Sequence, residues 1–164
     1  MQIDQDWEFV HVRPDRSPQW LIDWYSENCA HVIVMEIREA NGVPHDEGRW
    51  IRTKATGVVR DIFKTSGNRR INVNDAIDVQ ALGGELRFGH VLARTGDAMP
   101  LTPMRRYLIF LDYADEWKAL HAETIFLIEG EKLVNLSQIN PYSKELHGIA
   151  LSEVRQRVNA PAKR

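Results

Sequence analysis

The stretch that decides the fold runs from Met99 to Tyr113 and reads MPLTPMRRYLIFLDY. Its two prolines indicate a loop. After the loop, residues 107–111 (YLIFL) place no polar side chain on either side of the chain. A strand that is apolar on both faces must be covered on both faces. We therefore expect residues 107–111 to form a central strand of a closed or double-layered β-structure.

Other β-rich segments lie before and after this strand, separated by turn and loop signals. Gly57 lies in the middle of a long β-rich segment, where a glycine indicates the bulge or bend that a small barrel needs to close. Residues 41–48 have the composition of a loop, and residues 86–93 form a weak strand candidate that Gly89 interrupts. The remaining expected strands are residues 30–40, 50–63, 77–81, 124–128 and 132–136.

A helix is expected at each end of the β-rich region. Ser17-Pro18 is a helix start, because serine caps an N-terminus and proline is tolerated at the first helical position. The apolar residues of segment 20–25 form one face of this helix, and those of segment 151–158 indicate a short C-terminal helix. Strands and helices do not alternate, which argues against a parallel α/β sheet. The sequence therefore predicts a mainly β protein, a small antiparallel OB-like barrel with an N-terminal helix and a short C-terminal helix.

The size and charge of the chain limit its organisation and its partners. With 164 residues, it is expected to form an N-terminal arm (1–15), a single barrel domain (16–160) and a frayed tail (161–164). Residues 1–82 carry 10 basic and 13 acidic side chains (−3), and residues 83–164 carry 11 and 10 (+1), for a net charge of −2. Nucleic acid is disfavoured as the main partner, because a binder of nucleic acid usually has a basic stripe or domain.

The single cysteine and the apolar pattern limit the class of protein further. One cysteine allows neither an intrachain disulfide nor a thiolate zinc cluster. No apolar run approaches 18 residues, so no membrane span is expected. The first residues are acidic and unlike a signal peptide. As given, the sequence is typical of a cytoplasmic protein, or of an exported one whose leader has been removed.

Two groups of residues are candidates for catalysis. The sequence contains no phosphate-binding loop, dinucleotide fingerprint, nucleophile elbow or HExxH motif. His45 and Asp46 in a loop, with His121 and Glu123 on one side of a strand, could supply metal ligands if they converge. Residues in such places are also commonly just solvated.

The other catalytic candidate is a thiol. Cys29 and His31 are two residues apart, so along a strand they could share a face and form a thiol–base pair. The alternative interpretation is that Cys29 is a small buried residue where the first helix meets the first strand.

A candidate binding face lies on the long strand that begins at residue 50. Trp50, Arg52 and Lys54 alternate with other residues, so they point to the same side, and Arg69 and Arg70 lie in the following loop. Together they could bind an acidic or single-stranded ligand by stacking and charge. A solvated strand with one exposed tryptophan would show the same residues.

The order of these features resembles that of a known class of domains. A helix is followed by CAHVIVMEI (29–37), GVVRDIFK (57–64), RYLIFL (106–111) and GIALSEV (148–154). This order resembles the bacterial tissue-inhibitor-of-metalloproteinase-like OB-fold domains, small five-stranded barrels that are usually of unknown function and often exported. The metalloproteinase inhibitors themselves place an N-terminal cysteine on the protease zinc. Cys29 is internal and alone, so the resemblance does not imply that mechanism.

Together, these patterns predict a barrel and indicate no set of catalytic residues that would meet at one site. We therefore predict a non-enzymatic binding or protein-interaction module that needs no cofactor and has another protein as its partner. The alternative is a small hydrolase that depends on a metal or on the thiol.

Overall fold

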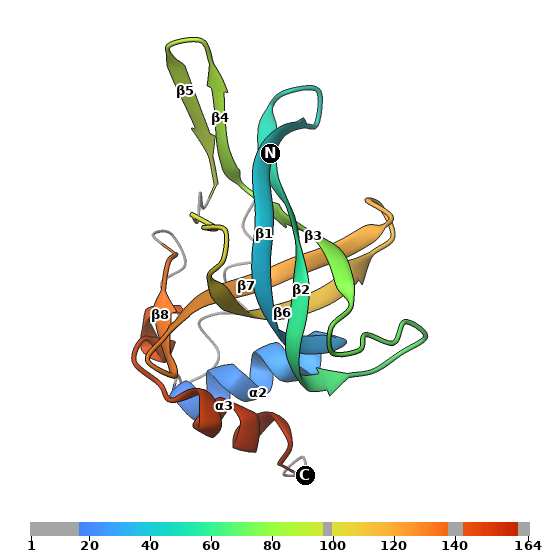
Figure 1. Ribbon diagram of the computed structural model, residues 1–164, viewed down its shortest axis with the longest axis vertical. Helices are drawn as coiled ribbons and strands as arrows, with labels where there is room; N and C mark the ends of the chain where they lie inside the picture. Colours follow the sequence, from blue (N-terminus) through green and yellow to red (C-terminus); the bar gives the residue numbers. More distant parts are fainter. Residues whose placement is uncertain (1–16, 97–99, 138–142, 161–164) are drawn as a thin grey trace, which may run out of the picture.

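The structure, a computed structural model, describes residues 17–96, 100–137 and 143–160. The expected N-terminal arm (1–15) and the tail (161–164) lie outside the described residues. The described chain is mainly β, with one helix before the strands and one after them (Figure 1). None of its helices is long and apolar enough to span a bilayer.

Five strands of the described chain close into a barrel. In one antiparallel sheet the strand order is β3-β2-β1-β6-β7, and a parallel contact between β7 and β3 closes the circle through the pairs Val79–Leu120 and Gln80–His121. This arrangement confirms the predicted antiparallel OB-like barrel. The strands are β1 (His31–His45), β2 (Trp50–Thr65), β3 (Ala76–Leu82), β6 (Arg106–Ala114) and β7 (Ala119–Glu129), with β8 (Lys132–Asn135) added beside β7.

Residues 107–111 form the centre of β6, as the sequence predicts. None of the five is more than 1% exposed. Tyr107, Ile109 and Leu111 pack inside the barrel, whereas Leu108 and Phe110 pack on the opposite side, in the layer beneath the helices. The central strand is therefore covered on both faces, which explains why it carries no polar side chain.

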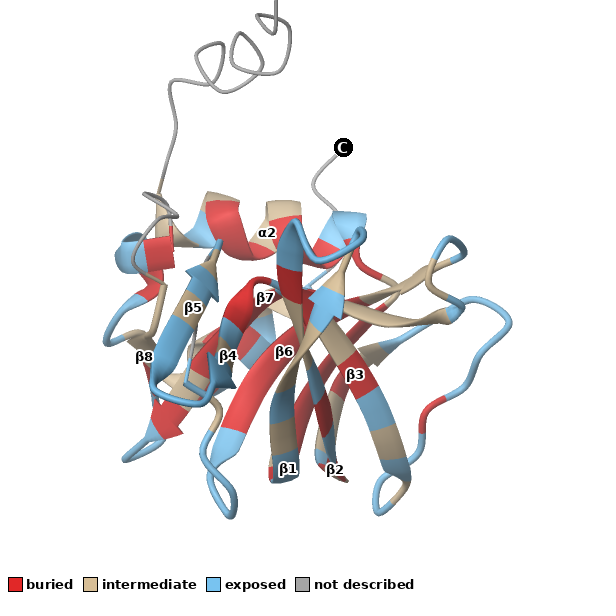
Figure 2. Cartoon of the chain, turned by 90° about the horizontal axis from the view of Figure 1, so that it is seen from above, coloured by how far each residue is buried: buried red, intermediate tan, exposed pale blue. Residues whose placement is uncertain are grey.

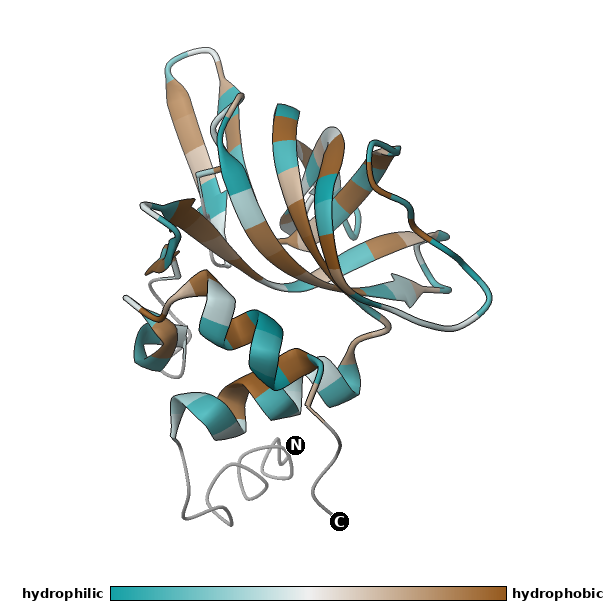
Figure 3. Ribbon diagram, turned by 60° about the horizontal axis from the view of Figure 1, so that its bottom comes forward, coloured by the Kyte–Doolittle hydropathy of each residue, from teal (hydrophilic) through white to brown (hydrophobic). Residues whose placement is uncertain are grey.

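Two helices cover the outer face of the central strand. Helix α2 (Pro18–Asn28) begins at the predicted Ser17-Pro18 signal, where the backbone N–H of Trp20 donates to Ser17 Oγ over 3.2 Å. Helix α3 (Leu151–Val158) follows a short 3-10 helix η1 (Ser143–Leu146) and has no side-chain cap. Figure 3 shows α2 and α3 side by side beneath the barrel with apolar bands on both, and their buried apolar residues pack against the outer face of the central strand.

The prediction of a loop at residues 41–48 is wrong for most of this segment. β1 continues to His45, and only the turn at residues 46–49 separates it from β2. Gly42 lies inside this strand. Only glycine fits there, because a Cβ would overlap the backbone carbonyl oxygen of Glu85. In this segment the glycine permits a close approach between two backbones instead of a turn.

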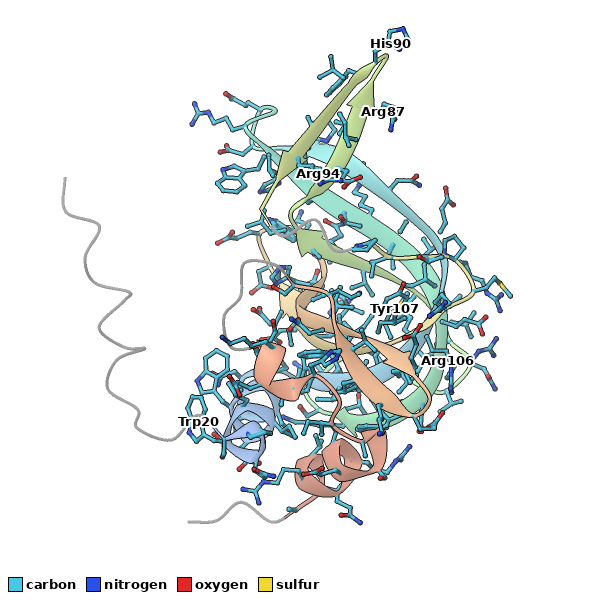
Figure 4. The ribbon with its side chains drawn as sticks, turned by 90° about the vertical axis from the view of Figure 1, so that its left-hand side faces the viewer. Trp20, Arg87, His90, Arg94, Arg106 and Tyr107 are labelled. Atoms are coloured by element: carbon cyan, nitrogen blue, oxygen red, sulfur yellow. The ribbon has the colours of Figure 1, made fainter. Side chains whose placement is uncertain are left out.

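The weak strand at residues 86–93 is a hairpin. β4 (Gly84–Phe88) and β5 (Val91–Thr95) form a separate two-stranded sheet, and Gly89 lies in the turn between them with φ +58°. The hairpin projects from the barrel (Figure 1), Figure 2 shows β4 and β5 coloured mostly as exposed, and Figure 4 shows Arg87 and Arg94 along it with His90 at its end. The Thr95 hydroxyl at its base accepts the backbone N–H of Ile51 over 2.7 Å.

Candidate binding surface

The outer face of β2, β3 and β7 carries part of the predicted binding set. Side chains alternate along each strand, and those of Ala55, Val79 and Ala122 pack inside the barrel. The intervening side chains therefore face outwards in neighbouring rows. Those rows hold Arg52 and Lys54 on β2, Gln80 on β3 and His121 on β7, with Lys54 opposite Gln80 and Gln80 opposite His121.

Trp117 connects three strands at one edge of this face. It lies in the turn between β6 and β7, where its backbone N–H donates to the carbonyl oxygen of Ala114 over 3.1 Å. Its ring centroid lies 4.7 Å from that of His121 and 5.2 Å from that of His45, both in edge-to-face geometry. The guanidinium carbon of Arg52 lies 5.4 Å from the same centroid. We call these four residues the Trp117 cluster.

A carboxylate adjoins the cluster. Glu123 lies 3.1 Å from His121 Nδ1. The hydrogen bond from His121 lowers the pKa of Glu123 against the opposing effect of burial. Near neutral pH Glu123 therefore remains a charged acceptor that orients the ring of His121 against Trp117.

The candidate metal ligands come into one neighbourhood without forming a ligand set. His45 and His121 contact the same tryptophan ring, Glu123 bonds to His121, and Asp46 lies exposed in the turn after β1. Within residues 17–96, 100–137 and 143–160, no three His, Cys, Asp or Glu side chains gather closely enough to hold a metal ion. The indole of Trp117, contacted by both histidine rings, occupies the place where they meet.

The predicted binding residues divide into two places. Trp50, Arg52 and Lys54 face outwards on β2, and Trp50 lies at its first position, opposite His45. Arg69 and Arg70 lie in the loop between β2 and β3, where the guanidinium carbon of Arg69 is 3.7 Å from the ring centroid of Tyr113.

Sequence reasoning missed Trp117, Tyr113 and Gln80. The segment DYADEWKAL (112–120) does place two aromatic residues among charges at a turn. His121 is near Trp117 in the chain, but the other partners come from distant segments, so the sequence alone does not reveal those contacts.

The predicted thiol pair lies in the interior. Cys29 is 2% exposed between α2 and β1, and desolvation by burial is the main reason that its pKa rises to about 12. His31 is equally buried, its Nδ1 lies 2.9 Å from Thr65 Oγ1, and burial lowers its pKa. A nucleophilic cysteine needs a thiolate. This environment instead favours a neutral thiol at Cys29 and a neutral imidazole at His31.

Cys29 is accordingly expected to be unreactive in the folded protein. At pH 8 a pKa of about 12 leaves about one thiolate in 10,000 thiols, so Ellman's reagent should react about a thousandfold more slowly than after unfolding. The release of thionitrobenzoate measures both rates, and the urea-unfolded chain, with its single thiol, serves as the control. Prompt reaction of the native protein would show that the thiol is activated and would support the hypothesis of a thiol-dependent hydrolase.

No protein-family model matches the chain, and comparison with curated proteins found no similar one. The function is therefore inferred from the geometry of the surface.

Proposed function

We propose that this protein is a non-enzymatic binding module that holds a segment of a partner protein on the outer face of β2, β3 and β7. The Trp117 cluster is the observation that carries this proposal, because it combines a half-buried aromatic ring with a guanidinium and two imidazoles. The cluster joins the β1–β2 turn to the β6–β7 turn. In OB barrels, the face between the corresponding turns is where ligands bind.

The chemistry of this face suits a protein partner. Tryptophan and arginine are the residues that most often dominate the binding energy of protein interfaces, and Arg52 and Trp117 already contact each other. Lys54 lies exposed beside them. Arg52 and Lys54 bring two cations to the face, and Asp78 and Glu123 bring two carboxylates, a mixture that favours a polar partner segment able to pair with both signs of charge. The net charge of −2 argues against a polyanionic nucleic acid, whose affinity depends on neutralising many phosphates.

Partner capture tests this proposal. Immobilised wild-type protein is compared with Trp117→Ala and Lys54→Glu, and the captured proteins are quantified by mass spectrometry. Loss of a central tryptophan should reduce the recovery of a specific partner about 30-fold, equivalent to about 2 kcal/mol. Lys54→Glu should reduce it as well, by reversing a charge on the same face.

Lys144→Glu is the matched control, because it reverses an exposed lysine on η1, away from β2, β3 and β7. It should leave capture unchanged, and thermal melting establishes that each variant is folded. Equal recovery by all four proteins would rule out this face as the binding surface.

A further inference from the structure

Two buried polar atoms on the outer face of β2 and β3 have no hydrogen-bond partner within the described residues. One is the donor Nε of Arg52, and the other is the acceptor Oε1 of Gln80. Buried polar groups in folded proteins are nearly always paired, since an unpaired one loses its water without compensation. Two such atoms of opposite hydrogen-bonding character on one face suggest that a bound group pairs with them.

The strand order shows what covers these atoms. The ring of Trp117 contacts Arg52 on β2 and His121 on β7. β3 lies between these two strands, and Gln80 is directly opposite His121. The indole therefore lies across β3 near Gln80. Arg52 is a diagonal neighbour of Gln80, because it is two residues from Lys54, the direct partner of Gln80. Long side chains at such diagonal positions come within reach of a common group.

Among the described residues, the indole of Trp117 is held by contacts with the rings of His45 and His121 and with the guanidinium of Arg52. Its N–H makes no hydrogen bond within these residues, and because the side chain is only half-buried, water can serve as its acceptor. The turn that carries it is four residues long and includes Lys118 with φ +50°. A ligand can therefore displace the indole without breaking a hydrogen bond of its side chain.

We propose that a primary carboxamide, from an asparagine or glutamine side chain of the partner segment, takes the place of the Trp117 indole. Its carbonyl oxygen accepts from Arg52 Nε–H, and its N–H donates to Gln80 Oε1. A primary carboxamide presents an acceptor and a donor on the same edge, which matches this pair. The displaced indole then packs against the apolar part of the partner. The inference rests on the proposed function, since it names the group that the binding face recognises.

The free protein provides the first test. Gln80→Met removes the unpaired acceptor while retaining a long side chain, so the melting temperature should rise by about 2–4 °C, the shift expected from relieving one unsatisfied group. Gln156→Met, at an exposed position of α3, is the matched control and should leave the melting temperature unchanged. A lower melting temperature for Gln80→Met would show that the amide is already stabilised, which would overturn the inference.

Binding of a minimal probe provides the second test. Propionamide is titrated into the ¹⁵N-labelled protein, and the indole N–H signal of Trp117, assigned with Trp117→Phe, is followed by NMR. N,N-dimethylpropionamide retains the carbonyl but has no N–H, so it should bind about fivefold more weakly, the loss expected for one hydrogen bond. Gln80→Met should abolish this difference.

Equal binding of the two probes, or no shift with either, would overturn the inference. A larger response to adenosine would also overturn it, in favour of a nucleobase as ligand. The two proposals fail separately. If capture depends on Trp117 and Lys54 but the two amides bind equally, only the assignment of a carboxamide as the bound group is wrong. If propionamide is preferred while capture is indifferent to both residues, the carboxamide site stands, but the partner-binding function and the partner as source of the carboxamide are wrong.

Discussion

Phe110→Ala is expected to lower the free energy of unfolding by about 3–5 kcal/mol, the range for removing a large aromatic side chain from a packed core. Phe110 is fully buried on the face of β6 that meets α2. Its ring centroid lies 5.3 Å from that of Tyr25 and 6.5 Å from that of Phe126. Truncation removes these contacts and leaves a cavity that the surrounding sheet and helix cannot fill. Urea unfolding followed by circular dichroism measures the loss.

Phe88→Ala is the matched control, because it is the same substitution at a side chain that is 61% exposed on the projecting hairpin. Its effect should stay within about 0.5 kcal/mol, as for most surface substitutions. If the two variants lost similar stability, the central strand would not lie between two apolar layers, and the barrel with its helical cover would be wrong.

Gly57→Ala is expected to have the second largest effect, a loss of about 1–3 kcal/mol, typical of overpacking in a close-packed region. A Cβ at Gly57 would overlap the backbone carbonyl oxygen of Glu36 and the methyl group of Met35. The β1–β2 register shifts here, between Ile37 and Glu39. The backbone cannot move away without disturbing the bulge that lets the sheet curl. Urea unfolding again measures the loss.

Thr56→Ala is the neighbouring control, since its side chain is exposed on the same strand. It should cost less than about 1 kcal/mol, the full span of the strand-preference scale. Wild-type stability for Gly57→Ala would mean that β1 and β2 are not in close contact at this point.

Glycines illustrate how far local patterns predict this fold. The sequence predicts a bulge at Gly57, and the register shift lies opposite it, although the extra residue, Arg38, belongs to β1. The sequence pattern around Gly42 indicates a loop, whereas Gly42 lies in a strand that the backbone of β4 approaches closely. A glycine needed for a turn and a glycine needed for close approach look the same in a sequence, because the second depends on a segment some 40 residues away.

The candidate surface was predictable only in part, for a similar reason. Alternation along one strand is local, so Arg52 and Lys54 could be placed together on an outward face. Trp117 could not be assigned to that face, because its contacts with His45 and Arg52 arise only when the barrel closes. The same closure places Gln80 opposite His121, and no spacing in the sequence indicates it.

The sequence by itself determined the class of fold, since the apolar residues 107–111 require cover on both faces, the strands do not alternate with helices, and Ser17-Pro18 begins a helix. These features depend on residues that are neighbours in the chain and on the burial of apolar surface. Both can be read from the composition and from the spacing of the apolar residues. Only the tertiary structure decided which side chains meet on the outer face. Barrel closure joins β3 to β7, about 40 residues apart in the chain, and so brings Arg52, Gln80, Trp117 and His121 together.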